Sequence, residues 1–288
     1  MIGVALIQAL LDHHGAARIY AVVRKGSPKA ERLPEDSRIT IVACDINEYE
    51  QLPELVGDSC DVFYHFAWKS TGRREVRNTA IVQQEQNIRF SLEALAAAKA
   101  LGCTKFIGAG SQAEFGPLDL PKISPDSPAD PVEAYGIAKL AAGKLVRMQA
   151  MLWGMDCFWV RIFSVYGKLD QPTTMVSGTL RKLLDGRVPE FTPAEQKWDY
   201  LNEKDAGEAF YLIGEKAHGN KVYCLGSGQT RSLKEYIEEM RDMIDPTREL
   251  GFGKLPYPPH PVMNLCADIS ALQKDTGWGG RASPSLRA

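Results

Sequence analysis

An alternation of short apolar runs and longer helix-like stretches, between residues 3 and 162, constrains the fold most. The runs lie at 19–23, 39–43, 62–66, 105–109 and 157–162, and the helical stretches at about 3–14, 48–56, 77–101 and 133–153. Runs with few polar residues are typical of parallel strands that helices cover on both faces. With right-handed crossovers, the pattern predicts an α/β fold with a doubly wound parallel sheet of the Rossmann type.

Beyond residue 167 this rhythm loosens, and Pro and Gly become frequent between 246 and 261. The elements expected there are helices near 173–186, 205–216 and 232–243 and a strand at 221–225. We therefore expect a larger domain over 1–167 and a smaller α+β lobe over 168–288, with chain exchange between the two.

The composition argues against several classes of protein. Apolar residues make up 44% and charged residues 24%, which is ordinary for a soluble protein, and the net charge of −2 gives no reason to expect nucleic acid. No apolar run approaches the ~20 residues of a membrane span, and the opening residues lack the basic segment and cleavage site of a signal peptide. The six cysteines stand singly without metal-ligand spacing, so we expect reduced thiols, no metal and a cytoplasmic protein.

Tyr135 and Lys139 are the sharpest chemical signal. A spacing of four near the start of a helix places the phenol and the ammonium on one face, one turn apart. A free tyrosine has a pKa of about 10, and a nearby cation lowers it toward the range that suits general acid/base catalysis. The same spacing also arises by chance, so the pair gains its meaning from its neighbours.

Ser111 ends an apolar run that finishes in small residues. Ligands of open α/β sheets bind outside the carboxyl ends of the strands, where this hydroxyl falls, so it can contact a substrate oxygen beside Tyr135. The alternative is a serine that only caps a turn.

Several further segments stand in a fixed order along the chain: Asp45-Ile46, His65-Phe-Ala67, Ser111-Gln-Ala-Glu-Phe-Gly116, Tyr135-xxx-Lys139, Arg161-Ile-Phe-Ser-Val-Tyr-Gly167, Trp198-Asp-Tyr-Leu201 with Asp205, Val222 to Gly228, and Ser232-Leu233. Together they resemble the NAD-dependent epimerase/dehydratase family of extended short-chain dehydrogenases, whose pattern reads SSxxVYG, YxxxK, RxFNVYG. The resemblance covers essentially the whole chain. Phe115 stands where the family usually has Tyr, Ser164 where it has Asn, and Trp198 where many members have Arg; the last two are expected to alter substrate contacts.

The resemblance implies a role for each matching residue. Ser111 would position a sugar oxygen, Tyr135 would transfer the proton, and Lys139 would hold the nicotinamide ribose and lower the pKa of Tyr135. The implied cofactor contacts are Gly3, Arg24, Asp45, Ile46, Phe66, Ala67, Lys139, Phe163 and Val165. The implied substrate contacts are Gln112, Ser164, Thr192, Trp198 and Asp199.

Cofactor and substrate have local clues. The run at 19–23 ends in Arg24 and Lys25 instead of an acidic residue, and cations suit a ribose 2′-phosphate, so we favour NADP over NAD. The alternative is a solvated strand end. The segment 195–201 resembles the EQxWDYL stretch of bacterial deoxysugar enzymes, which favours reduction of a nucleotide-linked 4-keto-6-deoxyhexose over 4-epimerisation. The family also implies a homodimer.

The glycine-rich phosphate turn of the family is almost absent. Residues 1–4 resemble its tail, with Gly3 as the last glycine, so we expect the first strand to be missing through an incomplete sequence or a late start codon. That strand would be the central one. The alternatives are a non-catalytic NAD(P)-binding or redox-sensing protein, or an inactive fragment.

Overall fold

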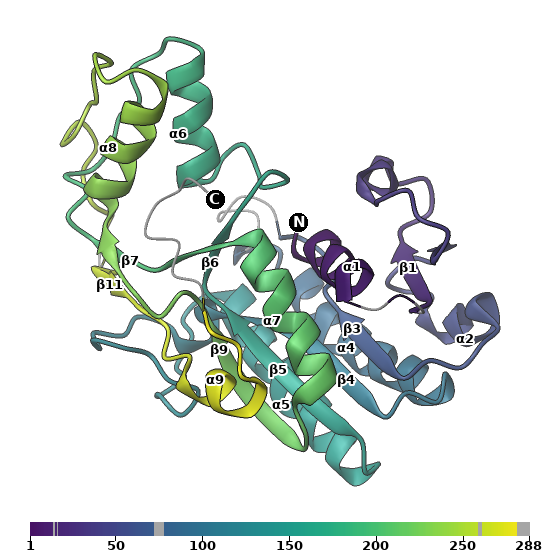
Figure 1. The fold of residues 1–288 in the computed structure, drawn as a ribbon. Helices are drawn as coiled ribbons and strands as arrows, with labels where there is room; N and C mark the ends of the chain where they lie inside the picture. The colour runs from purple at the N-terminus through teal and green to yellow at the C-terminus, as the bar shows by residue number, and fades with distance from the viewer. Residues whose placement is uncertain (14, 16, 72–77, 259–260, 281–288) are drawn as a thin grey trace.

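Four parallel strands form the main sheet of the computed structural model, which describes residues 1–13, 15, 17–71, 78–258 and 261–280. Their spatial order is β3-β4-β5-β9, and each runs parallel to its neighbours (Figure 1). The bounds are Val62–His65 for β3, Lys105–Ser111 for β4, Asp156–Ile162 for β5 and Asn220–Leu225 for β9. The predicted α/β fold with a parallel sheet is confirmed.

A second parallel sheet contains only β1 (Ile19–Val23) and β2 (Ile39–Ala43), which pair along their whole length. Both strands have the predicted bounds. Among the described residues no strand joins β1 to β3, and the two sheets stand apart in Figure 1. Short helical elements follow these strands: η1 (Pro28–Arg32), η2 (Tyr49–Gln51) and α2 (Leu52–Val56).

Helices cover both faces of the main sheet. On one face α1 (Ile2–His13) lies beside α7 (Glu203–Lys216), and on the other α4 (Ile81–Ala100) lies beside α5 (Ala134–Leu152) (Figure 1). Successive side chains of β4 point to opposite faces of the sheet. Ile107 packs in the apolar cluster with α1 and α7, and Phe106 packs in the cluster with α4 and α5. The start of the helix predicted over 77–101 falls partly on residues 72–77, which lie outside the described residues.

The second half of the chain contributes directly to the main sheet. α7 covers it, β9 is its edge strand beside β5, and α9 (Ser270–Thr276) packs back on both. Residues 203–225 thus pack with elements that precede residue 167. The division into two domains at residue 167, with chain exchange between them, stays a prediction.

A smaller group of elements lies away from the sheet, with α6 and α8 standing together in the upper left of Figure 1. It comprises α6 (Met175–Leu184), α8 (Leu233–Ile244) and the three-stranded sheet of β7 (Lys197–Trp198), β10 (Arg231–Ser232) and β11 (Asn264–Leu265). The pair β6 (Ser164–Tyr166) and β8 (Tyr200–Asn202) connects it to the carboxyl end of β5. The group has its own apolar core, which includes Leu183, Ile237 and Met240.

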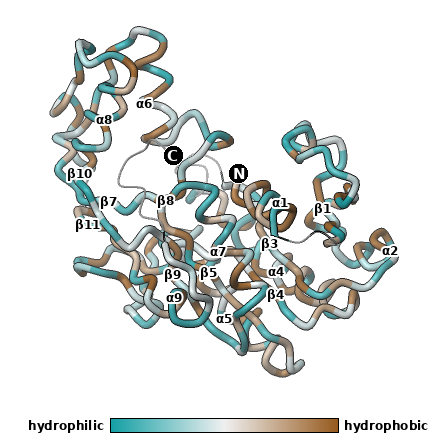
Figure 2. The backbone as a smooth tube through the Cα atoms, viewed as in Figure 1, coloured by the Kyte–Doolittle hydropathy of each residue, from teal (hydrophilic) through white to brown (hydrophobic). Residues whose placement is uncertain are grey.

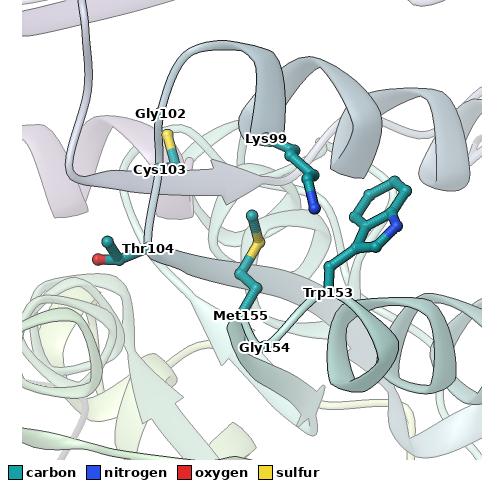
Figure 3. A pocket seen from close by; sticks show the side chains of 7 residues that line it. All are labelled: Lys99, Gly102, Cys103, Thr104, Trp153, Gly154 and Met155. Atoms are coloured by element: carbon teal, nitrogen blue, oxygen red, sulfur yellow. The ribbon is translucent and has the colours of Figure 1, made fainter.

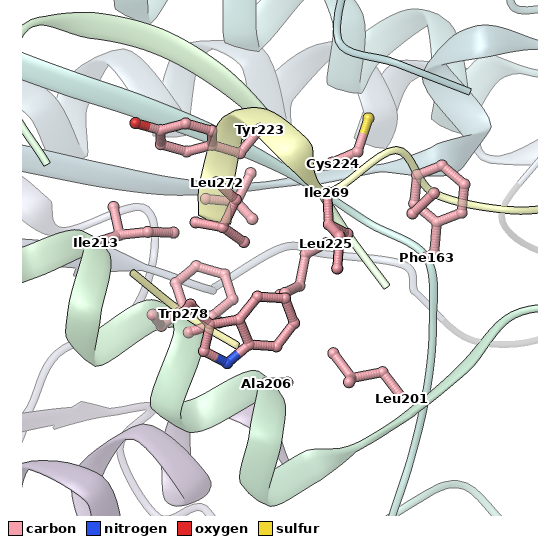
Figure 4. Packing of buried hydrophobic residues seen from close by; sticks show 14 of the residues in the cluster. Phe163, Leu201, Ala206, Ile213, Tyr223, Cys224, Leu225, Ile269, Leu272 and Trp278 are labelled. Carbon is pink, nitrogen blue, oxygen red and sulfur yellow. The ribbon is translucent and has the colours of Figure 1, made fainter. Parts of the chain in front are cut away.

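The largest apolar cluster lies between the main sheet and the layer of α1, α7 and α9, and Figure 4 shows part of it. Phe163, Leu201, Leu225 and Trp278 come from segments far apart in sequence and meet there. Figure 2 shows the corresponding hydrophobic positions along α1 and the central strands. Within the described residues, no helix combines the length and apolarity needed to cross a membrane.

Candidate active site

Ser111 is the last residue of β4 and lies at the carboxyl edge of the sheet, as the sequence predicts. It also begins η3 (Gln112–Phe115), because its hydroxyl oxygen accepts a hydrogen bond from the Ala113 amide at 3.2 Å. The structure therefore shows the serine capping a turn, and its own O–H proton is left for another acceptor. Its contact with a substrate oxygen stays a prediction.

Glu114 fixes this turn from inside the protein. Its side chain is fully buried and accepts hydrogen bonds from the Ser111 amide, the Trp159 indole and the Arg161 guanidinium, each at 2.8 Å. Arg161 is also buried, so the two charges form an ion pair out of contact with water. Because charged hydrogen bonds are strong in such surroundings, this pair fixes the backbone that carries Ser111.

Tyr135 reaches the same edge because α5 begins directly against η3. A Cβ atom at Gly136 would overlap the Ala113 carbonyl group, so only glycine permits this approach. Farther along α5, a Cβ at Gly143 would lie 2.6 Å from the Trp159 indole nitrogen. The two glycines let the helix pack closely on the sheet, which brings Tyr135 to the turn that begins at Ser111.

Lys139 lies one turn after Tyr135 and is only 4% exposed. Its ammonium donates to the Ala109 carbonyl of β4 at 2.6 Å and lies 6.0 Å from the centre of the Tyr135 ring. Burial lowers the pKa of Lys139 to about 7, and the nearby charge of Glu114 opposes that fall. The structure thus combines Ser111, Tyr135 and a buried cation at one sheet edge.

Trp68 also belongs to this group, although no motif in the sequence indicates it. Its ring centre lies 3.7 Å from the Lys139 ammonium nitrogen, and its ring meets that of Tyr135 edge-on at 6.1 Å between centres. Glu114, Arg161 and Trp159 were likewise given no role by the sequence. Two of them had a signal: Glu114, because a serine followed three residues later by a glutamate is the capping-box pattern, and Arg161, because it opens a segment that resembles a family motif.

Six of the residues predicted to bind the cofactor lie in three groups. A Cβ at Gly3 would lie 3.7 Å from the Phe66 ring, so α1 and the end of β3 are in contact, and the exposed Ala67 follows. Asp45 follows β2, and its carboxylate lies 3.8 Å from the Lys69 ammonium, while Ile46 packs on the core. Arg24 is exposed after β1, whose end pairs with the end of β2.

Phe163 and Val165 flank the crossing from β5 to β6. Phe163 is buried in the core and packs against Phe115, with ring centres 6.3 Å apart, and its amide donates to the Leu225 carbonyl at 2.9 Å. Val165 lies in β6 and is partly exposed.

Two predicted substrate residues contact each other. The Trp198 indole donates a 2.7 Å hydrogen bond to the Ser164 hydroxyl, which links β7 of the outer group to β6. Gln112 is partly exposed in η3, next to Ser111. Thr192 lies beyond α6, where its hydroxyl accepts from the Ala194 amide at 3.3 Å.

Asp199 has a different role from the predicted substrate contact. It is fully buried, and each carboxylate oxygen accepts two hydrogen bonds: one from the Ser227 amide and hydroxyl, the other from the Gly228 and Ala267 amides. Burial raises the pKa of Asp199, while these four donors oppose that rise. Because both oxygens are engaged, the side chain ties three chain segments together and has no acceptor left for a sugar.

Figure 3 shows a separate pocket of about 230 Å³ at the opposite, amino edge of the strands. Lys99, Cys103, Thr104 and Trp153 line it, and none of these is a predicted site residue. Across the described ranges, no three His, Cys, Asp or Glu side chains are grouped so as to hold a metal ion.

The donor set at the carboxyl edge fits a nicotinamide dinucleotide. An ammonium has three N–H donors, and Lys139 uses one of them on Ala109, so others can bind ribose hydroxyls. Arg24 supplies a cation at the end of a paired strand, the position at which such folds recognise the adenosine ribose.

Known proteins resemble this chain in sequence and in fold. A UDP-glucose 4-epimerase of Corynebacterium glutamicum is 24% identical over 263 residues, covering 84% of this chain and 77% of that protein. A dTDP-4-dehydro-6-deoxyglucose reductase of Escherichia coli is 27% identical over 183 residues, covering 62% and 57%.

Among solved structures, the fold matches a UDP-glucuronic acid 4-epimerase from Bacillus cereus in complex with UDP-glucuronic acid and NAD. The TM-score is 0.84 at 21% identity, covering 98% of this chain and 91% of that one. Other structures of the same fold hold NAD or NADPH. The model of the NAD dependent epimerase/dehydratase family matches residues 1–226. The chain therefore belongs to the NAD dependent epimerase/dehydratase family.

Proposed function

We propose that this protein is an NAD(P)-dependent oxidoreductase or 4-epimerase of a nucleotide-linked sugar, with reduction of a 4-keto-6-deoxyhexose favoured. The observation that carries the proposal is the buried Lys139 beside Tyr135 and Ser111 at the carboxyl edge of β4. Members of its family are NAD-dependent enzymes that act on sugar nucleotides. The E. coli relative named as a reductase supports the choice of reaction.

Each residue then has a defined task. A nicotinamide cofactor bound here would supply or accept the hydride. The Ser111 hydroxyl donates a hydrogen bond to the sugar carbonyl oxygen, and the Tyr135 phenol transfers the single proton that this oxygen gains when the carbon receives the hydride. Lys139 holds ribose hydroxyls and, when protonated, stabilises the phenolate of Tyr135. Glu114 keeps the Ser111 backbone in place.

Dehydration is a less favoured reaction for this site. Loss of water from a sugar needs an added acid and base beside the hydride-transfer residues. In the turn that follows Ser111, the neighbouring side chains are Gln112 and Ala113, and the carboxylate of Glu114 points inward to Arg161. We therefore favour ketone reduction or epimerisation, in which Tyr135 is the one acid/base group required.

We also propose that the cofactor is NADP. The support is the exposed Arg24 at the end of β1, followed by Lys25, where a 2′-phosphate would find two cations. Replacing Arg24 by Glu should weaken NADPH binding by about tenfold or more and leave NADH binding within about twofold. Equal loss for both cofactors would reject the preference.

The proposed substrate contacts are Gln112, Ser164, Thr192 and Trp198. The Ser164 hydroxyl already accepts a hydrogen bond from the Trp198 indole. We therefore propose that the sugar contacts a surface formed by the indole and this serine together. We propose that the sugar nucleotide lies between this pair and Ser111, under the outer group of elements.

A homodimer is also proposed, through α4 and α5. Along α5, the apolar side chains of Ile137, Leu145, Met148 and Leu152 are exposed at helical spacing, with Met148 at 53% and Leu152 at 71%. The exposed Ile81 and Val82 begin the adjacent α4. A second copy of this face would cover the stripe, so Met148→Glu should give monomers in sedimentation velocity where the parent chain gives dimers. A parent chain that sediments as a monomer would reject the dimer.

The activity test measures oxidation of NADPH or NADH with dTDP-4-keto-6-deoxyglucose, and interconversion of UDP-glucose and UDP-galactose. Tyr135→Phe should reduce turnover by about 10²–10⁴-fold without changing the melting temperature. A matched control is Tyr20→Phe, which loses only a phenol bound to Asp58 in the other sheet. Equal turnover in the parent chain and in Tyr135→Phe would reject the mechanism.

A non-catalytic cofactor-binding protein is the second candidate, because in the described chain β1 and β2 form a sheet separate from that of β3, β4, β5 and β9. It predicts cofactor binding in a fluorescence titration but no turnover with any of these substrates.

A further inference from the structure

Trp68 contacts both titratable side chains of the site. Its ring face lies against the Lys139 ammonium at 3.7 Å, and its ring meets Tyr135 edge-on. We propose that Trp68 is a positioning residue, whose ring face holds the Lys139 ammonium and whose edge contact orients the Tyr135 phenol. Its catalytic consequence rests on the proposed oxidoreductase function, whereas its effect on Lys139 does not.

Buried amides on α4 hold this tryptophan in place. The Trp68 indole donates to the Gln84 side-chain oxygen at 2.8 Å, and Gln84 donates to the Ser70 carbonyl at 3.1 Å. Asn87 accepts from the Lys69 amide at 2.8 Å and donates to the Lys69 carbonyl at 3.1 Å. Both amide side chains are 1% exposed. Because the loop after β3 is bonded to α4 through the indole and through the two residues that follow it, the ring position is set by the fold.

The aromatic face matters because Lys139 has little else to replace its hydration. Its one hydrogen-bond acceptor among the described residues is Ala109, at 2.6 Å. A desolvated cation over an indole face gains electrostatic stabilisation, and tryptophan is the best of the aromatic partners. Trp68 thus acts as a fixed neutral partner, which favours the ammonium without adding a negative charge beside the hydride-transfer site.

The charged and titratable groups around Lys139 come from four elements. Glu114 on η3 favours the ammonium and is itself paired with Arg161 of β5. His65 on β3 is buried and its pKa is lowered to about 3, so it stays neutral near pH 7. Tyr135 is the titratable neighbour on α5 itself. Because burial leaves the pKa of Lys139 at about 7, a modest change in its surroundings changes the fraction that is protonated.

The first test measures this titration by NMR of the chain labelled with ¹³C-lysine, with the Lys139 signal assigned from its absence in Lys139→Met. Trp68→Met fills the space without a π face and should lower the midpoint for Lys139 by roughly 0.5–1 pH unit. The Lys139 midpoint of Trp68→Phe should fall between those of the parent chain and Trp68→Met. If Trp68→Met fails to fold, the Phe variant still carries the comparison.

The matched control is Trp153→Met, because Trp153 lies under the Lys99 ammonium at 4.6 Å on the far edge of the sheet (Figure 3). It should leave the Lys139 midpoint unchanged. A rise in the midpoint for Trp68→Met would mean that the ring mainly excludes water, and an unchanged midpoint would mean that its face does not act on the ammonium. Either result overturns the proposal.

The second test uses turnover of dTDP-4-keto-6-deoxyglucose with NADPH. Trp68→Met should move the alkaline limb of the kcat/KM profile to lower pH, by the shift that NMR gives, with Trp68→Phe restoring part of it. An unmoved limb beside a shifted Lys139 titration would overturn the catalytic half. If the parent chain turns over none of the sugar nucleotides, the proposed function fails, and the NMR result still decides the effect on Lys139.

Discussion

Replacing Glu114 by Gln removes one negative charge from the network beneath Ser111. The parent carboxylate accepts from Ser111 and Trp159 through one oxygen and from Arg161 through the other, all at 2.8 Å. The amide can keep its carbonyl oxygen toward the first two donors. Its NH₂ group then faces the guanidinium, so an acceptor becomes a donor and the buried cation loses its counter-charge.

The expected cost follows from the burial of both partners. Removing one member of a buried ion pair costs about 3–5 kcal/mol, because the other charge remains without water. Arg161 keeps a 3.0 Å hydrogen bond to the Pro125 carbonyl and lies over the Phe115 ring, which places the cost near the lower end. A loss of about 3 kcal/mol lowers the melting temperature by roughly 6–12 °C in a chain of this size.

Urea denaturation and calorimetry near pH 7 measure this loss, with Glu93→Gln as the matched control. Glu93 accepts from Arg89 at 2.6 Å on the exposed face of α4, where such a pair contributes less than about 1 kcal/mol. Our reasoning is refuted if the two variants lose similar stability, since burial would then not decide the contribution of the Glu114 pair. Glu114→Gln should also lower the pKa of Lys139, because the lost charge favours the ammonium.

Three further perturbations test the packing around the site. His65→Phe should make the stability of the fold less sensitive to acid. Below pH 6.5 the histidine of the unfolded chain becomes protonated, whereas in the folded chain its pKa of about 3 keeps it neutral. Between pH 6.5 and 5 the parent chain should therefore lose roughly 2 kcal/mol of stability relative to the variant, measured by urea denaturation. Gly143→Ala should cost about 1–3 kcal/mol despite the better helix propensity of alanine, because its Cβ would approach the Trp159 ring to 2.6 Å; a stabilised variant in thermal melts would contradict this. Asp199→Asn should cost about 2–4 kcal/mol, because its NH₂ group would face N–H donors; an unchanged denaturation midpoint would show that the buried carboxylate does not hold its three segments.

The sheet and the position of the chemical residues could be predicted because both depend on short-range patterns. Apolar runs locate β1 to β5, and the ends of such strands locate Ser111. The spacing of Tyr135 and Lys139 defines one helix face without knowledge of what the helix packs against. Helix α7 and strand β9 were located along the chain by the same kind of pattern. Their return to the main sheet was not placed, because strand order depends on pairing across more than fifty residues.

Other features depend on contacts that no local pattern reveals. Trp68 is one of five tryptophans, and its neighbour Lys139 lies 71 positions along the chain. Asp199 lies in a motif that suggests contact with a ligand, yet its four hydrogen-bond donors come from two other segments of the chain. In both cases the role of the side chain follows from which atoms surround it, and that is a property of the assembled fold.

The depth at which Lys139 is buried links these two kinds of information. Gly136 and Gly143 permit the close approach of α5, and the capping box of η3 holds the strand end that meets it. This approach removes water from the ammonium, which lowers its pKa to about 7 and makes its charge depend on Glu114 and Trp68. A lysine left in water would carry its charge at every pH of interest and would act weakly on a neighbouring phenol, because water screens the interaction. The close packing that lowers the pKa of Lys139 therefore also strengthens the effect of the ammonium charge on the Tyr135 phenol. Residues outside the YxxxK motif determine how far Lys139 is protonated.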